Sequence, residues 1–113
     1  MRSTRTPQEP WYGVRTLYRF PAGTADSSVL YEERVVVFKA RSMEAAISRA
    51  EIEGRKYAQE NECEYLEYVL AFHIFASVLG AGTEVFSLMR DSALEPDAYI
   101  DAFFDTGAER AQL

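Results

Sequence analysis

The sequence contains very few of the side chains that build metal centres and reactive sites. Among its 113 residues there is one cysteine, Cys63, and one histidine, His73. A single cysteine cannot form an internal disulfide, and the acidic neighbours Glu62 and Glu64 disfavour its thiolate. We therefore interpret Cys63 as an unreactive thiol in a reducing cytoplasm. With one histidine and no cysteine pair, we expect no soft-metal site and no cofactor.

Long apolar runs and nucleotide-binding motifs are also missing. No stretch approaches the roughly 20 apolar residues that span a bilayer, and the start, MRSTRTPQEP, lacks the apolar segment of a signal peptide. Gly80 and Gly82 are not followed by the rest of a phosphate-binding motif, and no serine has a histidine at the spacing of a hydrolase motif. We expect a cytoplasmic protein that is not an enzyme and has no membrane partner.

Positive charge is scarce in the second half of the chain. Residues 1–59 contain ten Lys or Arg and seven Asp or Glu, giving +3, whereas residues 60–113 contain two Arg and eleven acids, giving −9; the total is −6. The acidic half argues against nucleic acid as a ligand, because phosphates repel carboxylates. It is compatible with a basic protein partner, although acids also keep a small domain soluble.

The first half of the chain predicts two strands and a long helix. Residues 11–20 (WYGVRTLYRF) alternate with period two, and residues 29–40 place β-branched side chains next to one another. The loop at residues 21–28 suits an antiparallel connection, in which Glu32 or Glu33 would pair with an arginine of the first strand. Ser42 is a predicted helix cap, and a stripe of mostly small residues then predicts a helix that ends near Glu60 or Asn61.

The second half predicts a hairpin and a short helix. Residues 65–77 and 83–89 are the expected third and fourth strands, joined through LGAG, and Pro96 opens the last helix. The order ββαββα indicates an α+β fold with a four-stranded, mainly antiparallel sheet. The long helix would pack on one face of that sheet, and the short C-terminal helix would cover part of the other. We expect one domain over residues 11–105, a disordered N-terminal tail over 1–10 and a C-terminal tail over 106–113.

Three segments carry a resemblance to a known family. The segments WYGVR, EERVVVFKARSMEAAISRAE and GTEVFS, within Trp11 to Leu88, resemble a family of small, mostly bacterial domains known only as domain of unknown function number 4288. The resemblance implies no established activity and no catalytic residues. Small domains of this type often occur in toxin–immunity loci, so it also suggests a role in interbacterial competition. The loop at 21–28 and the tail after Asp105 lie outside the resemblance.

An excess of apolar surface leads to the functional hypothesis. On the third strand Leu70, Phe72 and Ile74 should face one way and Val69, Ala71 and Phe75 the other, and one long helix covers only one side. We predict a non-enzymatic protein-binding module with an apolar sheet face and an acidic rim, such as an immunity-type inhibitor of a basic toxin. The predicted partner-binding residues are Glu62, Glu64, Glu67, Asp97, Asp101, Val69 and Phe75.

Two other interpretations stay open. The apolar face could instead join two copies in a structural homodimer that has no toxin partner. A small enzyme using His73 with Glu67 is the third, but Phe72 and Ile74 flank the imidazole, and a buried histidine that makes one hydrogen bond is the simpler interpretation.

Overall fold

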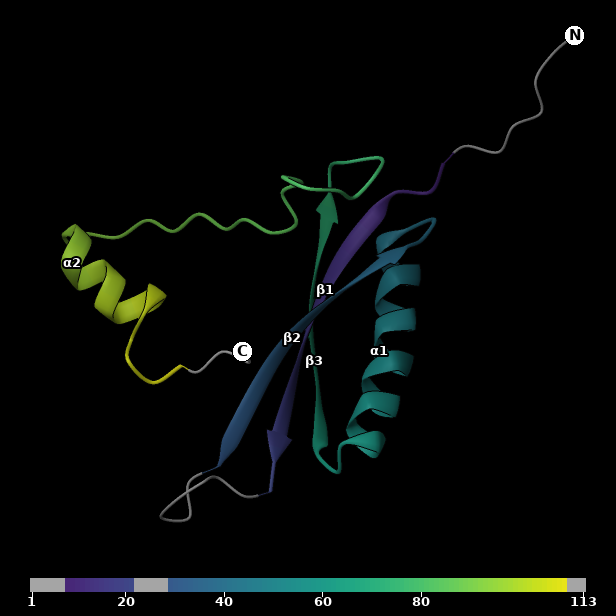
Figure 1. Ribbon diagram of the computed structural model, residues 1–113, viewed down its shortest axis with the longest axis horizontal. Helices are drawn as coiled ribbons and strands as arrows, with labels where there is room; N and C mark the ends of the chain where they lie inside the picture. The colour runs from purple at the N-terminus through teal and green to yellow at the C-terminus, as the bar shows by residue number, and fades with distance from the viewer. Residues whose placement is uncertain (1–7, 22–28, 110–113) are drawn as a thin grey trace, which may run out of the picture.

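The computed structural model describes residues 8–21 and 29–109. It is an α+β fold with a three-stranded antiparallel sheet, one long helix and a short C-terminal helix (Figure 1). Residues 22–28 of the expected loop and most of the expected tails lie outside the described residues. The elements are β1 (Trp11–Phe20), β2 (Leu30–Lys39), α1 (Met43–Glu60), β3 (Glu64–Ile74), α2 (Pro96–Tyr99) and η1 (Ile100–Phe104).

The first strand of the chain is the central strand of the sheet. The order is β2-β1-β3, and β1 pairs antiparallel with both neighbours. The ladder to β2 is regular from Trp11↔Lys39 to Phe20↔Leu30, whereas the ladder to β3 shifts register between Thr16 and Tyr18. At this irregularity Glu67 has a φ of 58°, a left-handed conformation that is uncommon outside glycine.

Helix α1 forms where the capping signal and the small-residue stripe predict it. The Ser42 side chain accepts a hydrogen bond from the Ala45 backbone N–H at 3.1 Å, which satisfies one of the free amides of the first turn. The buried residues of the helix recur every four positions and are all small: Ala46, Ala50, Gly54 and Ala58. They let α1 lie close to the sheet, where Tyr12 and Val14 are buried beneath it.

The prediction of a fourth strand at residues 83–89 is wrong. Residues 83–89 form no strand and pair with none of the described strands, so β3 remains an edge strand and ends at Ile74 rather than Ser77. A turn closed by Thr83 N–H donating to Gly80 O at 3.1 Å redirects the chain, which then runs away from the sheet (Figure 1). Without an aligned backbone partner, the alternating side chains of this segment cannot by themselves make a ladder.

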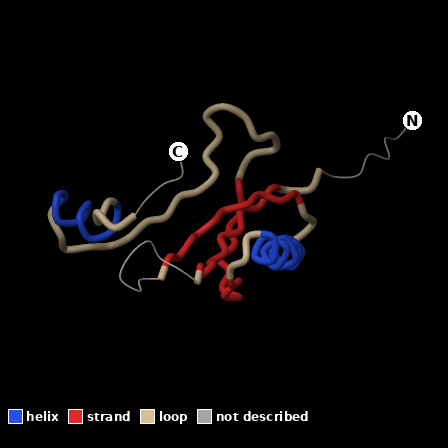
Figure 2. The backbone as a smooth tube through the Cα atoms, turned by 60° about the horizontal axis from the view of Figure 1, so that its bottom comes forward, coloured by secondary structure: helices blue, strands red, loops and turns tan. Residues whose placement is uncertain are grey.

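The C-terminal helix is present but does not cover the sheet as expected. It begins with Pro96 in its first turn and continues through one turn of π-helix to Phe104. Among the described elements it packs against neither the sheet nor α1, and it stands apart from both in two views (Figures 1 and 2). The extended connection after β3 carries it too far from the sheet for contact. One sheet face is therefore left uncovered by this helix.

Candidate functional site

The two faces of the sheet differ in burial. Beneath α1, the even-numbered residues of β1 from Tyr12 to Tyr18 are buried. On the opposite side the sheet presents large side chains to solvent, with exposed fractions of 74% for Tyr68, 55% for Tyr31, 53% for Leu70 and 47% for Val35. We call this side the open face and define it by Arg15, Leu17, Tyr31, Glu33, Val35, Tyr68 and Leu70.

The open face combines an apolar groove with ion pairs. A groove of about 330 Å³ runs between β1 and β3, lined by Arg15, Leu17, Glu33, Tyr68 and Leu70 among others. The Arg15 Nε donates to Glu33 Oε1 at 2.9 Å, which confirms the predicted cross-strand pair. Tyrosine and arginine are enriched in protein interfaces, where an apolar centre is bordered by polar groups.

One end of the open face is already covered by the chain itself. Gly13 lets the Phe72 ring lie across β1, because a Cβ at this position would be 2.4 Å from two atoms of that ring. The Phe86 ring, from the extended segment after β3, then packs on Phe72 with centroids 5.0 Å apart. This contact shows that apolar side chains of the C-terminal segment fit against the sheet on this side.

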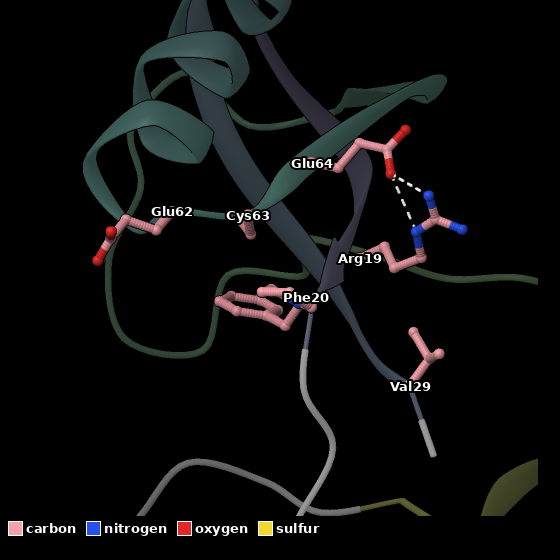
Figure 3. A pocket seen from close by; sticks show the side chains of 7 residues that line it. Arg19, Phe20, Val29, Glu62, Cys63 and Glu64 are labelled. Atoms are coloured by element: carbon pink, nitrogen blue, oxygen red, sulfur yellow. Dashed lines mark hydrogen bonds and ion pairs between the residues drawn. The ribbon is translucent and has the colours of Figure 1, made fainter. Parts of the chain in front are cut away.

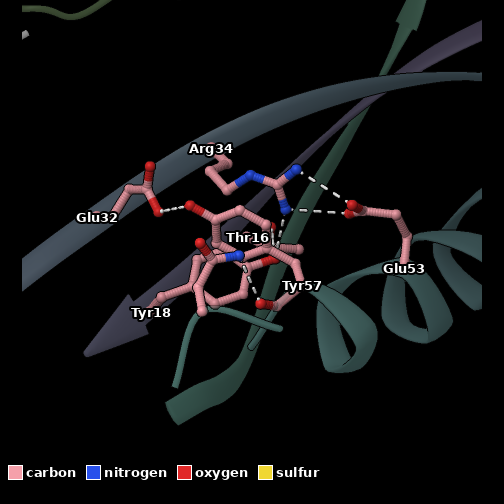
Figure 4. Close-up of polar contacts among 7 residues, drawn as sticks. Thr16, Tyr18, Glu32, Arg34, Glu53 and Tyr57 are labelled. Atoms are coloured by element: carbon pink, nitrogen blue, oxygen red, sulfur yellow. Dashed lines mark hydrogen bonds and ion pairs between the residues drawn. The ribbon is translucent and has the colours of Figure 1, made fainter. Parts of the chain in front are cut away.

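The face under α1 carries a polar cluster that the sequence analysis did not find (Figure 4). Two guanidinium nitrogens of Arg34 donate to the two carboxylate oxygens of Glu53, both at 3.1 Å, and Nη1 also donates to Tyr18 Oη at 3.2 Å. The guanidinium carbon lies 3.6 Å from the centroid of the Tyr57 ring, a cation–π contact. The sequence shows only that a strand contains an arginine and that the following helix contains a carboxylate. The two pair only after the helix has packed on the sheet.

The hydroxyl of Tyr57 completes this cluster. It donates to Glu32 Oε1 at 2.6 Å, so Glu32 faces α1 while Glu33 faces the other side, as the alternation predicts. Burial, reinforced by the Glu32 hydrogen bond, raises the pKa of Tyr57 to about 12. The phenol therefore stays protonated at neutral pH, and the cluster fastens α1 to β2 through paired groups.

A second hollow, of about 430 Å³, lies at the turn between α1 and β3 (Figure 3). Its lining includes Arg19, Glu62, Cys63 and Glu64, and Arg19 Nε donates to Glu64 Oε1 at 2.9 Å. Burial first, and then the charge of Glu32, raise the pKa of the Cys63 thiol. The predicted disfavoured thiolate is confirmed, but the causes are burial and a β2 carboxylate rather than the sequence neighbours.

The structure brings together three of the five predicted acids. Glu62, Glu64 and Glu67 lie at or just after the turn between α1 and β3, and Glu67 Oε1 is 3.7 Å from an Arg55 nitrogen. Asp97 and Asp101 are exposed on the C-terminal helical segment, which stands away from the sheet (Figure 1). The five acids therefore do not form one continuous rim in a single chain.

The two apolar residues predicted to bind a partner, Val69 and Phe75, do not lie on the open face. Val69 pairs with Thr16 and packs against the core beneath α1, so it is partly buried. Phe75 follows the end of β3 and is exposed, with its ring 4.2 Å from the His73 ring. Tyr68 and Leu70 occupy the open face instead, beside the irregularity at Glu67 that the sequence pattern does not signal.

His73 makes aromatic contacts. Its ring is half-buried and lies 5.3 Å from the Tyr12 ring, in addition to the Phe75 contact. The predicted hydrogen bond is not among the contacts that the structure describes. In residues 8–21 and 29–109 no group of three or more His, Cys, Asp or Glu is placed to hold a metal ion, and no helix there is long and apolar enough to cross a membrane.

The antiparallel three-stranded sheet with one helix on one face defines a small α+β domain. The chain belongs to the family described as Domain of unknown function (DUF4288), whose family model matches residues 11–87. This confirms the resemblance seen in the sequence, although the match also includes residues 21–28, which were expected to lie outside it. The match contains the whole sheet, α1 and the segment that places Phe86 on Phe72, and it ends before the C-terminal helix. Comparisons with curated proteins and with solved structures find no match.

Proposed function

We propose that this chain is a non-enzymatic protein-binding module that holds another protein chain on its open face. The observation that carries the proposal is the exposure of Tyr31, Val35, Tyr68 and Leu70 on one side of a sheet whose other side is covered by α1. Complete burial of a side chain such as leucine or valine is worth about 1.5–3 kcal/mol, and roughly half of that remains unused at Val35 and Leu70.

The composition of the open face supports a protein rather than a small molecule as the ligand. The groove is open to solvent and has the Arg15–Glu33 ion pair in its lining, and the exposed tyrosines stand on two different strands. Tyrosines and arginines supply much of the binding energy at protein interfaces, whereas small-molecule sites enclose most of their ligand. The surface of another protein can extend across the sheet and contact both tyrosines at once.

The proposal can be tested by site-specific photo-crosslinking in cells that produce the full chain. A photoreactive phenylalanine analogue at position 68 lies on the open face, and the same analogue at position 52 is a matched control, because Ile52 is 68% exposed on α1. We expect discrete protein–protein cross-links from position 68 and few from position 52. Equal cross-linking from both positions would contradict the proposal.

A basic protein is a second candidate for the partner, favoured by the charge of residues 60–113, which contain eleven acids and two arginines. Glu62, Glu67 and the aspartates of the C-terminal helix are exposed and available to attract it. An immunity-type inhibitor of a bacterial toxin, acting in the cytoplasm, is the functional role that this charge suits. A homodimer without a toxin partner is the alternative role.

The charge-based candidate has its own test. The five substitutions Glu62→Gln, Glu64→Gln, Glu67→Gln, Asp97→Asn and Asp101→Asn remove five negative charges, and neutralising Glu9, Glu44, Glu51, Glu84 and Asp91 instead provides a control of equal charge. Binding to a basic toxin encoded beside this chain should weaken at least tenfold, with a smaller salt dependence, only in the first set. Equal effects of both sets would show that binding depends on the net charge of the chain and not on the five chosen positions.

A further inference from the structure

The segment after β3 carries large apolar side chains that the described part of the chain leaves exposed. We call residues 76–105 the C-terminal arm. Beyond Phe86, Met89 is 98% exposed and Phe104 is 80% exposed, and four other large apolar residues of the arm are exposed by about half. These four are Leu88, Leu94, Ile100 and Phe103. Exposed apolar surface that is concentrated in one segment normally marks a contact with another molecule.

The arm is nevertheless locally ordered. Arg90 Nη1 donates to Tyr99 Oη at 2.9 Å, and the same guanidinium lies 4.3 Å from the Phe103 ring centroid. The Tyr99 and Phe103 rings are 5.1 Å apart. These contacts stabilise the helix of residues 96–104. Isolated helices shorter than about 12–15 residues are nevertheless only marginally stable in water. The helix therefore needs a surface on which to pack.

The same chain offers such a surface, but its own helix does not lie on it. Phe86, at the root of the arm, packs on Phe72 at one end of the sheet face that α1 leaves free. Beyond Phe86 the chain leads away from the sheet, and α2 and η1 contact neither the sheet nor α1 (Figures 1 and 2). Among the residues that the structure describes, none of the C-terminal helix covers the groove beside Tyr68 and Leu70, and the apolar side of the helix faces solvent.

We propose that two copies of this chain exchange C-terminal arms, so that the helix of residues 96–104 from each copy packs in the open-face groove of the other. The inference rests on the proposed function and names the bound protein as a second copy. A twofold arrangement covers both apolar surfaces of each chain in one closed assembly, because each copy supplies one arm and one open face. A different partner would have to supply both complementary surfaces.

The area available agrees with a stable dimer. With about 150–250 Å² for a large side chain, the uncovered fractions of the six arm residues named above amount to roughly 700 Å². A standard protein interface takes about 800 Å² from each partner. About half of this area belongs to Leu88, Met89 and Leu94, which precede the helix. The arm therefore supplies nearly one standard share only when this extended part is enclosed together with the helix, and the reciprocal arm doubles the contact.

Sedimentation of the purified full chain tests the exchange. The double variant Phe103→Asp, Phe104→Asp alters only the arm, Leu70→Glu alters only the open face, and Ile52→Asp on α1 is the control. We expect dimers for the natural chain and the control, and a dimer dissociation constant raised by roughly 100-fold or more for the other two. Because the arm lies outside the sheet, circular dichroism of the arm variant should match that of the natural chain.

Mixing the two defective variants gives the sharper test. The Leu70→Glu chain has an intact arm and the arm variant has an intact open face, so their mixture restores one arm–face contact and should form a heterodimer that neither variant forms alone. A dimer that survives the arm substitutions would show direct pairing of two faces and would overturn the exchange. A natural chain that sediments as a monomer would overturn it as well. If that monomer still cross-links from position 68 to a different protein, the proposed function stands without the exchange; if it cross-links to nothing, both fail.

Discussion

Gly13 is the position where one added carbon should change the structure most, and we expect Gly13→Ala to destabilise the fold. A Cβ at this position would lie 2.4 Å from the Cε2 and Cζ atoms of Phe72, whereas ordinary carbon contacts are about 3.5–4.0 Å. The ring must therefore move by about 1 Å or more, which disturbs its contact with Phe86. Overpacking of this kind costs about 1–3 kcal/mol.

An opposing effect reduces the net loss. Alanine restricts the unfolded chain more than glycine does, and this stabilises a compatible site by about 0.4–1 kcal/mol. We expect Gly13→Ala to lower the free energy of unfolding by about 1 kcal/mol, measured by urea denaturation. In a Phe72→Ala background the clash is absent, so the same substitution should be neutral or stabilising.

The double-mutant cycle isolates the clash from other effects of the substitution. A coupling of about 1 kcal/mol or more between positions 13 and 72 is expected, since residues in contact usually couple by about 0.5–3 kcal/mol. If Gly13→Ala has the same effect in both backgrounds, the close approach of the Phe72 ring is not what requires glycine here, and the reasoning is refuted.

Three further predictions concern α1 and the polar cluster that fastens it. Glu53→Ala leaves Arg34 without its carboxylate, and because both side chains are partly exposed we expect a loss of about 1–2 kcal/mol in urea denaturation; an unchanged midpoint would show that the pair contributes nothing. The pKa of Tyr57 is about 12, above the value of 10.0 for a free tyrosine. At a pH between these two values, this tyrosine has lost its proton in the unfolded chain but keeps it in the folded chain. Stability should therefore be constant with respect to this group below pH 10 and fall as the pH rises toward 12, and Tyr57→Phe should make that fall shallower; a fall of equal slope in the variant would argue against the shift. Ser42→Ala removes the helix cap and should cost about 1 kcal/mol, with Ser42→Thr as the control that keeps the hydroxyl.

Local patterns were sufficient to predict most of the domain. Period-two alternation placed the first strand at residues 11–20, where β1 is found, and the Ser42 cap together with the small-residue stripe placed α1. Each of these signals depends on residues that are close in sequence. The fourth strand failed because its only signal was alternation, whereas a strand also requires a backbone partner, and the turn near Gly80 decides whether one is within reach.

The candidate site depended more on the fold and was harder to predict. The alternation of the third strand correctly separated Leu70 from Val69, but which side the helix would cover could not be read from the sequence. The left-handed conformation of Glu67 lies at an irregularity that no glycine marks. The Arg34 cluster joins a strand to a helix turn 19 residues later in the chain, so its partners become neighbours only after packing.

The central position of β1 has a consequence for synthesis of the chain. This strand leaves the ribosome before either of its two neighbours, and the second of them ends at Ile74, about sixty residues after β1 begins. Until then one row of its amide and carbonyl groups has no partner, and its aromatic side chains are only half enclosed. Pairings between distant segments form slowly, and incomplete sheets are prone to aggregate. A nascent chain that stops short of β3 should therefore depend on chaperones, whereas one that extends past it should not.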